Sequence, residues 1–308
     1  MKIKAFIAAA LIASLAPAFA MADEAAAPKT LFEYPTVPDK LTKPTMRANY
    51  MVEHLWDKCD LEKTVITDID AFHNTFTDYL SFFAVADRAV VEKSIKKFVE
   101  RAVKNSDNMN LIYGMLQTDL YSLYSPYCSD EAYNIFATNI VASKKASKEL
   151  KAKVKLNADI LNNSAVGAQV ADFPLRQSPS GVASLYGLSA NTTVLFFNAD
   201  GNIDCKIWKV RLSASLSAAE LIKSGNLRIV SIYPTNDVDD KLSTEPADWE
   251  VACLDDANNT FDQRLAPTVY LLDKDKKITT KFVGIDDLLA AIDRVAQSAK
   301  TTTTNTEE

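Results

Sequence analysis

The sequence predicts an α + α/β fold, in which an all-helical domain precedes an α/β domain. Between residues 45 and 165, apolar side chains recur at steps of three and four residues, which is the spacing of amphipathic helices. From residue 166 to residue 298 the pattern changes to short apolar runs rich in β-branched and aromatic residues. The chain has 308 residues, of which 48% are hydrophobic, so it contains enough apolar material for two cores.

Helical periodicity begins at Thr45 and predicts roughly five or six helices before residue 163. Asp107 and Asp130 are expected to cap two of them, because a carboxylate near a helix start can accept hydrogen bonds from the first free N–H groups. Aromatic residues such as Phe72 and Phe76 follow the same helical spacing. We expect them to form the core of this domain rather than a cofactor site.

Five apolar runs in the second domain are expected to be strands of a mixed sheet. A helix is expected over Ile203–Lys223, and a final amphipathic helix carries Leu288 and Ile292. The polar end of the chain, residues 299–308, predicts a disordered tail. The expected strands are Thr193–Phe197, Leu227–Tyr233, Val251–Leu254, Val269–Leu272 and Ile278–Phe282.

The first twenty residues have the three parts of a secretory signal peptide. Lys2 and Lys4 precede an apolar run from residue 5 to residue 16, and Ala18-Phe19-Ala20 supplies the small residues of a cleavage site. The run is shorter than the ~20 apolar residues that span a bilayer. We therefore expect export to the periplasm without a membrane span, a buried N-terminal helix being the alternative. Residues 21–44 predict a flexible lead-in.

The charge of the chain argues against a nucleic-acid partner. Removal of residues 1–20 takes away two lysines and moves the formal net charge from −6 to −8 (−6 minus 2). Nucleic-acid binding usually needs a dense basic patch, whereas the lysines here are scattered along the expected helices.

Two segments of the C-terminal half are typical of one fold family. An apolar strand ending at Phe197 leads through the loop Asn198–Cys205 into a helix, and Leu265-Ala266-Pro267-Thr268 precedes the strand that starts at Val269. With these segments, the C-terminal half resembles a thioredoxin-like domain. The resemblance implies that the peptide bond before Pro267 is cis. It also implies that Asn202, Ala266 and Pro267 border a binding groove beside the redox motif.

A second resemblance is carried by the segments Met46–Tyr50, His54–Asp57, Leu123–Pro126, Val166-Gly167 and Ala171–Phe173. With these segments, the N-terminal half resembles a helical domain of uncharacterised function that precedes thioredoxin-like domains in exported proteins of Bacteroidota. Together the two resemblances cover about residues 45 to 298.

The redox motif departs from the family pattern. In a Cys-x-x-Cys motif the first cysteine lies at a helix N-terminus, which stabilises its thiolate, and the second resolves the mixed disulfide. When Cys205 is aligned with the second cysteine, the first position is Asn202. Asparagine cannot form a thiolate, so the usual dithiol cycle cannot run here.

Four cysteines allow three complete disulfide pairings, and the sequence does not choose among them. Cys205 and Cys59 are expected to be buried, and Cys128 is expected to be the most exposed thiol. Cys253 could pair with Cys205 only if their α-carbons lie within ~7 Å.

Other chemistries lack the residues they need. His54 and His73, the two histidines, have no further ligand at metal spacing. The acidic residues Asp237, Asp239 and Asp240 lack the glycine and distal glutamate of a common calcium loop. The seven glycines of the chain form no glycine-rich loop that could bind phosphate. In the adjacent pairs Asp255-Asp256 and Asp286-Asp287 the two side chains are expected to point apart, so neither pair forms an acid/base site. We therefore expect no metal and no cofactor.

These observations favour an exported, non-catalytic binding or scaffolding module whose partner is an extended peptide or another exported protein. The alternative is an atypical thiol-disulfide oxidoreductase that uses Cys205 alone or with Cys253. A hydrolase in the helical domain has no supporting residues.

Overall fold

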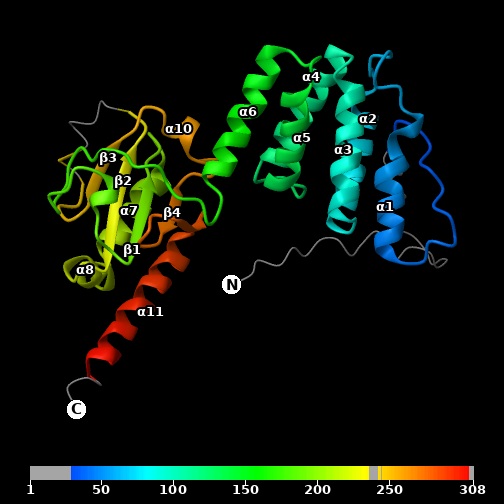
Figure 1. The fold of residues 1–308 in the computed structure, drawn as a ribbon. Helices are drawn as coiled ribbons and strands as arrows, with labels where there is room; N and C mark the ends of the chain where they lie inside the picture. Colours follow the sequence, from blue (N-terminus) through cyan, green and yellow to red (C-terminus); the bar gives the residue numbers. More distant parts are fainter. Residues whose placement is uncertain (1–28, 236–241, 244, 305–308) are drawn as a thin grey trace. The chain divides into compact units, whose positions relative to one another are not determined.

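The computed structural model describes residues 29–235, 242–243 and 245–304, with side-chain surroundings up to residue 298 (Figure 1). The expected signal peptide, residues 21–28 of the lead-in and the acidic residues Asp237, Asp239 and Asp240 lie outside the described residues. The chain divides into two compact units, Met1–Ala158 and Asp159–Glu308.

The first part of the chain is helical, as the sequence predicts. Trp56 lies at the centre of an aromatic cluster, with ring centroids 5.5 Å from Phe72, 5.7 Å from Tyr79 and 4.9 Å from Phe98. These rings are buried, so the aromatic stripe forms a core. The α-helices are α1 (Pro44–His54), α2 (Ile69–Ser81), α3 (Arg88–Ala102), α4 (Ser106–Met115), α5 (Asp130–Ala142) and α6 (Lys148–Asn163), and the shorter helices are η1 (Leu55–Lys58), η2 (Phe82–Ala84) and the π-helix η3 (Leu116–Tyr121).

The two predicted caps in this region are wrong. Asn105 caps α4, where its side chain accepts hydrogen bonds from the backbone N–H groups of Asp107 and Asn108. Ser129 caps α5, and Asp130 is the first residue of that helix. The cap is the residue before the first helical turn. The two aspartates lie inside the turn, where a carboxylate still interacts favourably with the helix dipole.

The second part of the chain contains a five-stranded mixed sheet in the order β3-β2-β1-β4-β5. Strand β1 pairs in parallel with β2, which pairs in parallel with β3, whereas β4 runs antiparallel to both β1 and β5. This arrangement confirms the expected mixed sheet. The strands are β1 (Thr192–Phe197), β2 (Leu227–Tyr233), β3 (Glu250–Cys253), β4 (Thr268–Leu272) and β5 (Ile278–Lys281). Strand β5 ends one residue before the expected Phe282, whose φ of 58° leaves the extended conformation.

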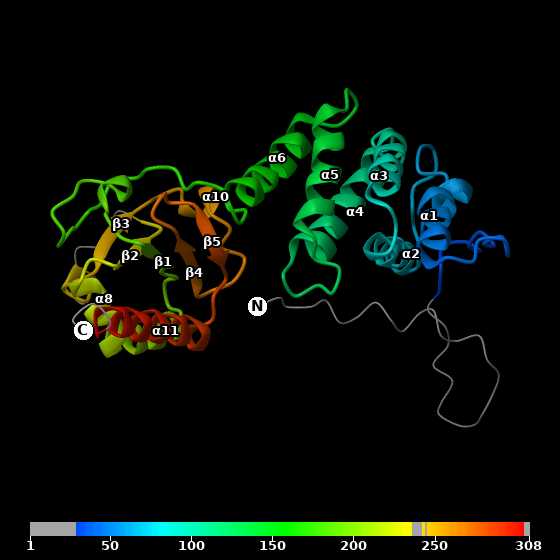
Figure 2. The same cartoon turned by 60° about the horizontal axis from the view of Figure 1, so that its bottom comes forward.

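Both faces of the sheet are covered, because neighbouring residues of a strand point to opposite sides. Val194 and Phe196 pack with α7 (Ile203–Ser213), α8 (Leu216–Lys223) and α11 (Ile285–Thr304). Leu195 and Phe197 pack on the other side, with the segment before β1 and with α10 (Ala257–Thr260). Figure 2 shows α8 and α11 side by side on one face and the chain before β1 on the other.

Two helical boundaries differ from the sequence-based expectation. The helix expected over Ile203–Lys223 is divided into α7 and α8, because the Ser215 side chain caps a new helix by accepting a hydrogen bond from the Ala218 N–H. Helix α11 continues to Thr304, into the expected disordered tail, and residues 305–308 lie outside the described residues. Within the described part of the chain, no helix has the length and apolar character needed to cross a membrane.

Candidate functional site

The predicted site residues lie on two segments at the end of the sheet where β1 finishes and β4 starts. Phe197, the last residue of β1, pairs with Thr268, the first residue of β4. The loop that carries Asn202 and the segment that carries Pro267 therefore leave the same end of the sheet. The Ala266–Pro267 peptide bond is cis, which confirms the prediction.

Asn202 is the N-cap of α7. Its side-chain oxygen Oδ1 accepts a hydrogen bond from the backbone N–H of Cys205 at 3.1 Å. The residue aligned with a nucleophilic thiol thus holds the helix start together. Asparagine is among the most favoured N-cap residues, so this role could have been predicted from the sequence.

Cys205 is a free thiol on the inner side of α7, with 3% of its surface exposed. It belongs to the core cluster that includes Phe196 and Trp249. Burial raises the pKa of the Cys205 thiol, although a backbone hydrogen bond at Ala199 and the nearby Lys209 ammonium act in the opposite direction. The neutral, less nucleophilic form is therefore favoured.

The four cysteines are all free thiols. Because Cys205 is a free thiol, no disulfide joins it to Cys253, which lies half-buried at the end of β3. Cys59 is buried as expected, and burial raises its pKa to about 11. Cys128 and Cys253 are both half-buried and are therefore more exposed than the two buried cysteines.

A buried polar cluster that the sequence did not indicate lies one turn beyond Cys205. The Lys209 ammonium donates a hydrogen bond to the Tyr233 hydroxyl at 3.0 Å and forms an ion pair with Glu245. The Tyr233 hydroxyl also donates to the Glu245 carboxylate, whose side chain has no exposed surface. Burial, and then the Glu245 hydrogen bond, raise the pKa of Tyr233. This cluster joins α7 to the end of β2.

A second buried cluster fixes the segment before Pro267. Arg264 donates two hydrogen bonds of 2.7 Å to the Asp262 carboxylate, and Lys281 donates a third of 2.7 Å. Burial alone would raise the pKa of Asp262, but the hydrogen bonds and charges of Arg264 and Lys281 outweigh it, and the pKa is lowered. The Tyr270 hydroxyl donates to the Asp262 carbonyl oxygen at 2.8 Å.

Ala266, between this cluster and Pro267, is exposed. Its backbone N–H and C=O groups form no hydrogen bond with any described residue. Pro267 itself is buried. An exposed backbone with free hydrogen-bonding groups can pair with another extended chain.

The remaining polar groups do not form a metal site in the described part of the chain. His54 contacts Asp57 at 2.8 Å, and His73 contacts the mostly buried Asp119 at 3.0 Å. The Asp286 carboxylate accepts a hydrogen bond from the Arg211 guanidinium at 2.6 Å.

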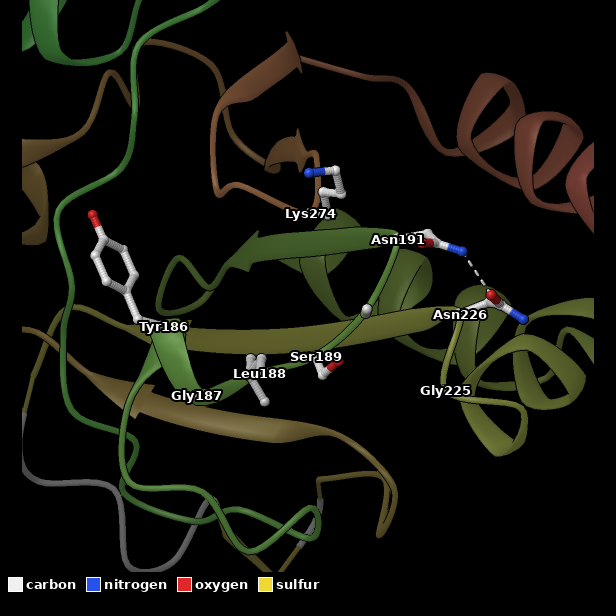
Figure 3. Close-up of a pocket in the computed structure, with 9 residues that line it drawn as sticks. Tyr186, Gly187, Leu188, Ser189, Asn191, Gly225, Asn226 and Lys274 are labelled. Atoms are coloured by element: carbon white, nitrogen blue, oxygen red, sulfur yellow. Dashed lines mark hydrogen bonds between the residues drawn. The ribbon is translucent and has the colours of Figure 1, made fainter.

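A shallow pocket of about 400 Å³ lies at the opposite end of the sheet (Figure 3). Its lining includes Asn191, which precedes β1, and Asn226, which precedes β2, and the two amides share a hydrogen bond of 2.7 Å. The segment Tyr186–Asn191 and Lys274 complete the wall. No residue predicted for the site lines this pocket.

Comparison with known proteins agrees with this division of the chain. Residues 18–164 match the family model of a domain of unknown function, DUF5106. No curated protein gives a significant match. A crystal structure of a thioredoxin-like protein from Bacteroides caccae is similar, with 24% identity and a TM-score of 0.64 over 85% of this chain and 98% of that chain.

Two further solved structures match a smaller share of the chain. One is the C-terminal domain of an uncharacterized protein from Bacteroides fragilis, with 26% identity, a TM-score of 0.37 and coverage of 42% of this chain and 98% of that chain. The other is the thioredoxin domain of a thiol-disulfide oxidoreductase from Bacteroides vulgatus, with 18% identity, a TM-score of 0.35 and coverage of 43% of this chain and 98% of that chain. The chain thus combines a helical region that matches DUF5106 with a thioredoxin-like α/β region.

Proposed function

We propose that this is an exported protein whose thioredoxin-like region binds an extended peptide beside Pro267 without thiol–disulfide exchange. The observation that carries the proposal is the hydrogen bond between Asn202 and the Cys205 N–H. The position of the attacking thiol is occupied by an amide that has a structural role. A backbone site for a peptide remains beside it.

Thiol chemistry at Cys205 is disfavoured because the side chain is buried, which limits both access to the thiol and its ionisation. Exchange requires a thiolate that can reach a substrate disulfide. Cys205 is almost completely buried, and its pKa is raised by that burial. The alternative function, an oxidoreductase using Cys205 alone or with Cys253, would need this thiol to become exposed and ionised.

Peptide binding is favoured by the backbone of Ala266. A bound extended segment can pair with the N–H and C=O groups of this exposed residue, as a strand pairs with a sheet edge. The buried ion cluster of Asp262, Arg264 and Lys281 holds the preceding segment in place. Pre-organisation lowers the entropy that binding must otherwise overcome.

Two assays on the chain beginning at residue 21 test the two parts of this function. Insulin reduction and reactivation of scrambled ribonuclease are expected to give no turnover above buffer. Turnover that disappears in Cys205→Ser would show that the alternative is correct.

Binding is measured with a permanently unfolded polypeptide, reduced and carboxymethylated α-lactalbumin. Ala266→Pro removes the N–H donor and is expected to weaken binding by about tenfold, the equivalent of one lost hydrogen bond. The control Ala266→Ser keeps the backbone donor and is expected to bind normally. A thermal melt of each variant verifies folding. Equal binding by the two variants, or no binding by the unsubstituted chain, would rule out the Ala266 backbone as the site.

A further inference from the structure

Helix α7 carries apolar side chains on two opposite faces. The inner face, with Cys205 and Leu212, belongs to the core of the sheet. On the outer face, Ile203, Ile207 and Val210 are 63%, 47% and 65% exposed. We call these three residues the outer stripe.

The outer stripe is continuous because its members are four and three residues apart, which places them on one side of a helix. A helix at the surface normally presents charged or polar residues to solvent, and an apolar face requires a partner to cover it. Leu216, at the start of α8, is also exposed and lies just beyond the stripe in the chain. A contiguous exposed apolar patch of this kind marks an interaction surface.

The charges beside the outer stripe identify the partner that fits it. Asp204 and Arg211 lie about two helical turns apart and therefore on the same side of the stripe. Asp204 lies near the beginning of the helix, and Arg211 near its end. Arg211 bonds to Asp286 at 2.6 Å, and a guanidinium has five N–H donors, so it retains the capacity to bind a second carboxylate.

We propose that the outer stripe is the centre of a homodimer, in which α7 packs antiparallel against α7 of a second copy around a two-fold axis. Ile207 then lies near the axis, and Ile203 faces Val210 of the second copy. The same symmetry places Asp204 opposite Arg211 of the second copy, and this pair occurs twice.

Self-complementarity is the reason to choose a second copy. A two-fold interface joins the same patch on both subunits, so each charged residue must meet an opposite charge within that same patch. Asp204 and Arg211 satisfy this requirement in the antiparallel arrangement, because the two-fold axis there brings the same side of both helices together and reverses their direction. Lys206 lies on the other side of the stripe, where it approaches Lys206 of the second copy near the axis. The long, flexible side chain of lysine allows each ammonium group to remain in water.

The primary experiment is sedimentation equilibrium of the chain beginning at residue 21. The unsubstituted protein is expected to be a dimer, and Ile207→Asp is expected to be a monomer whose circular dichroism spectrum shows that it is folded. Val166→Asp, an equally simple change at an exposed valine elsewhere in the same unit, is the control and should remain dimeric. A monomer at every concentration, or a dimer that Ile207→Asp leaves intact, would overturn the proposal.

Charge reversal tests the antiparallel arrangement. Asp204→Arg and Arg211→Asp are each expected to raise the dimer dissociation constant by about tenfold, because like charges then face each other. The double variant restores opposite charges and should recover affinity. Failure of the double variant to recover would overturn the arrangement.

A crosslink provides an independent readout. In a Cys128→Ser, Cys253→Ser background, Ile207→Cys is expected to give a disulfide-linked dimer on a non-reducing gel, whereas Val166→Cys should not. Absence of the Ile207→Cys crosslink, or an equal yield from Val166→Cys, would contradict a two-fold axis near Ile207.

Discussion

The Asn202 side chain accepts a hydrogen bond from the Cys205 backbone N–H at 3.1 Å, so the residue aligned with a missing thiol caps the helix that the second cysteine occupies. An N-cap side chain satisfies one of the N–H groups that a helix leaves unpaired. Asn202 therefore contributes to the stability of the helix start, and in the proposed function it stands where an attacking thiol would lie.

Replacing the cap should cost stability. Asn202→Ala is expected to lower the free energy of unfolding by about 1 kcal/mol, because the Cys205 N–H loses its acceptor. Asn202→Asp keeps an acceptor at the same place and should be close to the unsubstituted protein. Urea denaturation followed by circular dichroism measures both. A loss of the same size in Asn202→Asp would show that the cap is not the cause.

Supplying the missing thiol should create activity. Asn202→Cys restores two cysteines at Cys-x-x-Cys spacing, with the first at a helix N-terminus that favours its thiolate. We expect measurable insulin reduction from this variant. Asn202→Ser, which keeps a capping oxygen without a thiol, is the control and should remain inactive. If Asn202→Cys forms its disulfide and still gives no turnover, the scaffold lacks more than the nucleophile.

Cys205 and Cys59 should resist alkylation in the folded protein. Both are buried, and burial raises both pKa values, that of Cys59 to about 11. Iodoacetamide at pH 8 is expected to leave both unlabelled, whereas urea should make both reactive. Mass spectrometry of peptides locates the label. Rapid labelling of Cys205 under native conditions would support the oxidoreductase alternative.

The raised pKa of Cys59 also predicts how stability changes at high pH. The unfolded chain loses the thiol proton near the ordinary pKa of 9.0, whereas the folded chain keeps it until about pH 11. The unfolded state therefore binds fewer protons between these values, and the contribution of Cys59 to stability falls as pH rises. Cys59→Ala should remove this part of the pH dependence, measured as melting temperature from pH 8 to pH 11.

The buried cluster of Asp262, Arg264 and Lys281 should stabilise the folded segment before Pro267. Asp262→Asn leaves the buried Arg264 and Lys281 without their carboxylate and is expected to cost about 3 kcal/mol. Asp275→Asn, at an exposed ion pair, should cost less than about 1 kcal/mol.

The pH dependence of stability gives a second test of Asp262. Because the folded-state pKa of Asp262 is lowered, its contribution to the free energy of unfolding is present above the unfolded pKa and is lost as pH falls through acid values. Denaturation between pH 3 and pH 7 measures both effects, and equal losses in the two variants would contradict this role.

Export can be tested by processing in a bacterial host. The mature protein is expected to begin near Met21 and to be recovered from the periplasmic fraction. Ala20→Arg places a large charged residue at the cleavage position and should leave the leader attached. N-terminal sequencing distinguishes the two forms. An unprocessed chain retained in the cytoplasm would contradict the signal-peptide interpretation.

The sequence by itself determined the order of the elements and the presence of asparagine, rather than cysteine, three residues before Cys205. Strand β1 and the aromatic core around Phe72 were predictable because apolar periodicity is a local property of the chain. Asn202 was equally informative, because the identity of one side chain decides whether a thiolate can form. Cap positions were less predictable, since Asp107 and Asn105 are both capable capping residues two positions apart.

Only the tertiary structure decided which polar residues meet and which apolar residues remain uncovered. Glu245 reaches Lys209 across a long stretch of chain, and no local pattern in the sequence links them. The same is true of α7, where Ile207 and Leu212 are both large aliphatic residues of one helix. Ile207, in the outer stripe, faces solvent, whereas Leu212 faces the core. Burial depends on what the rest of the chain places against each face, and that is a property of packing rather than of any single segment.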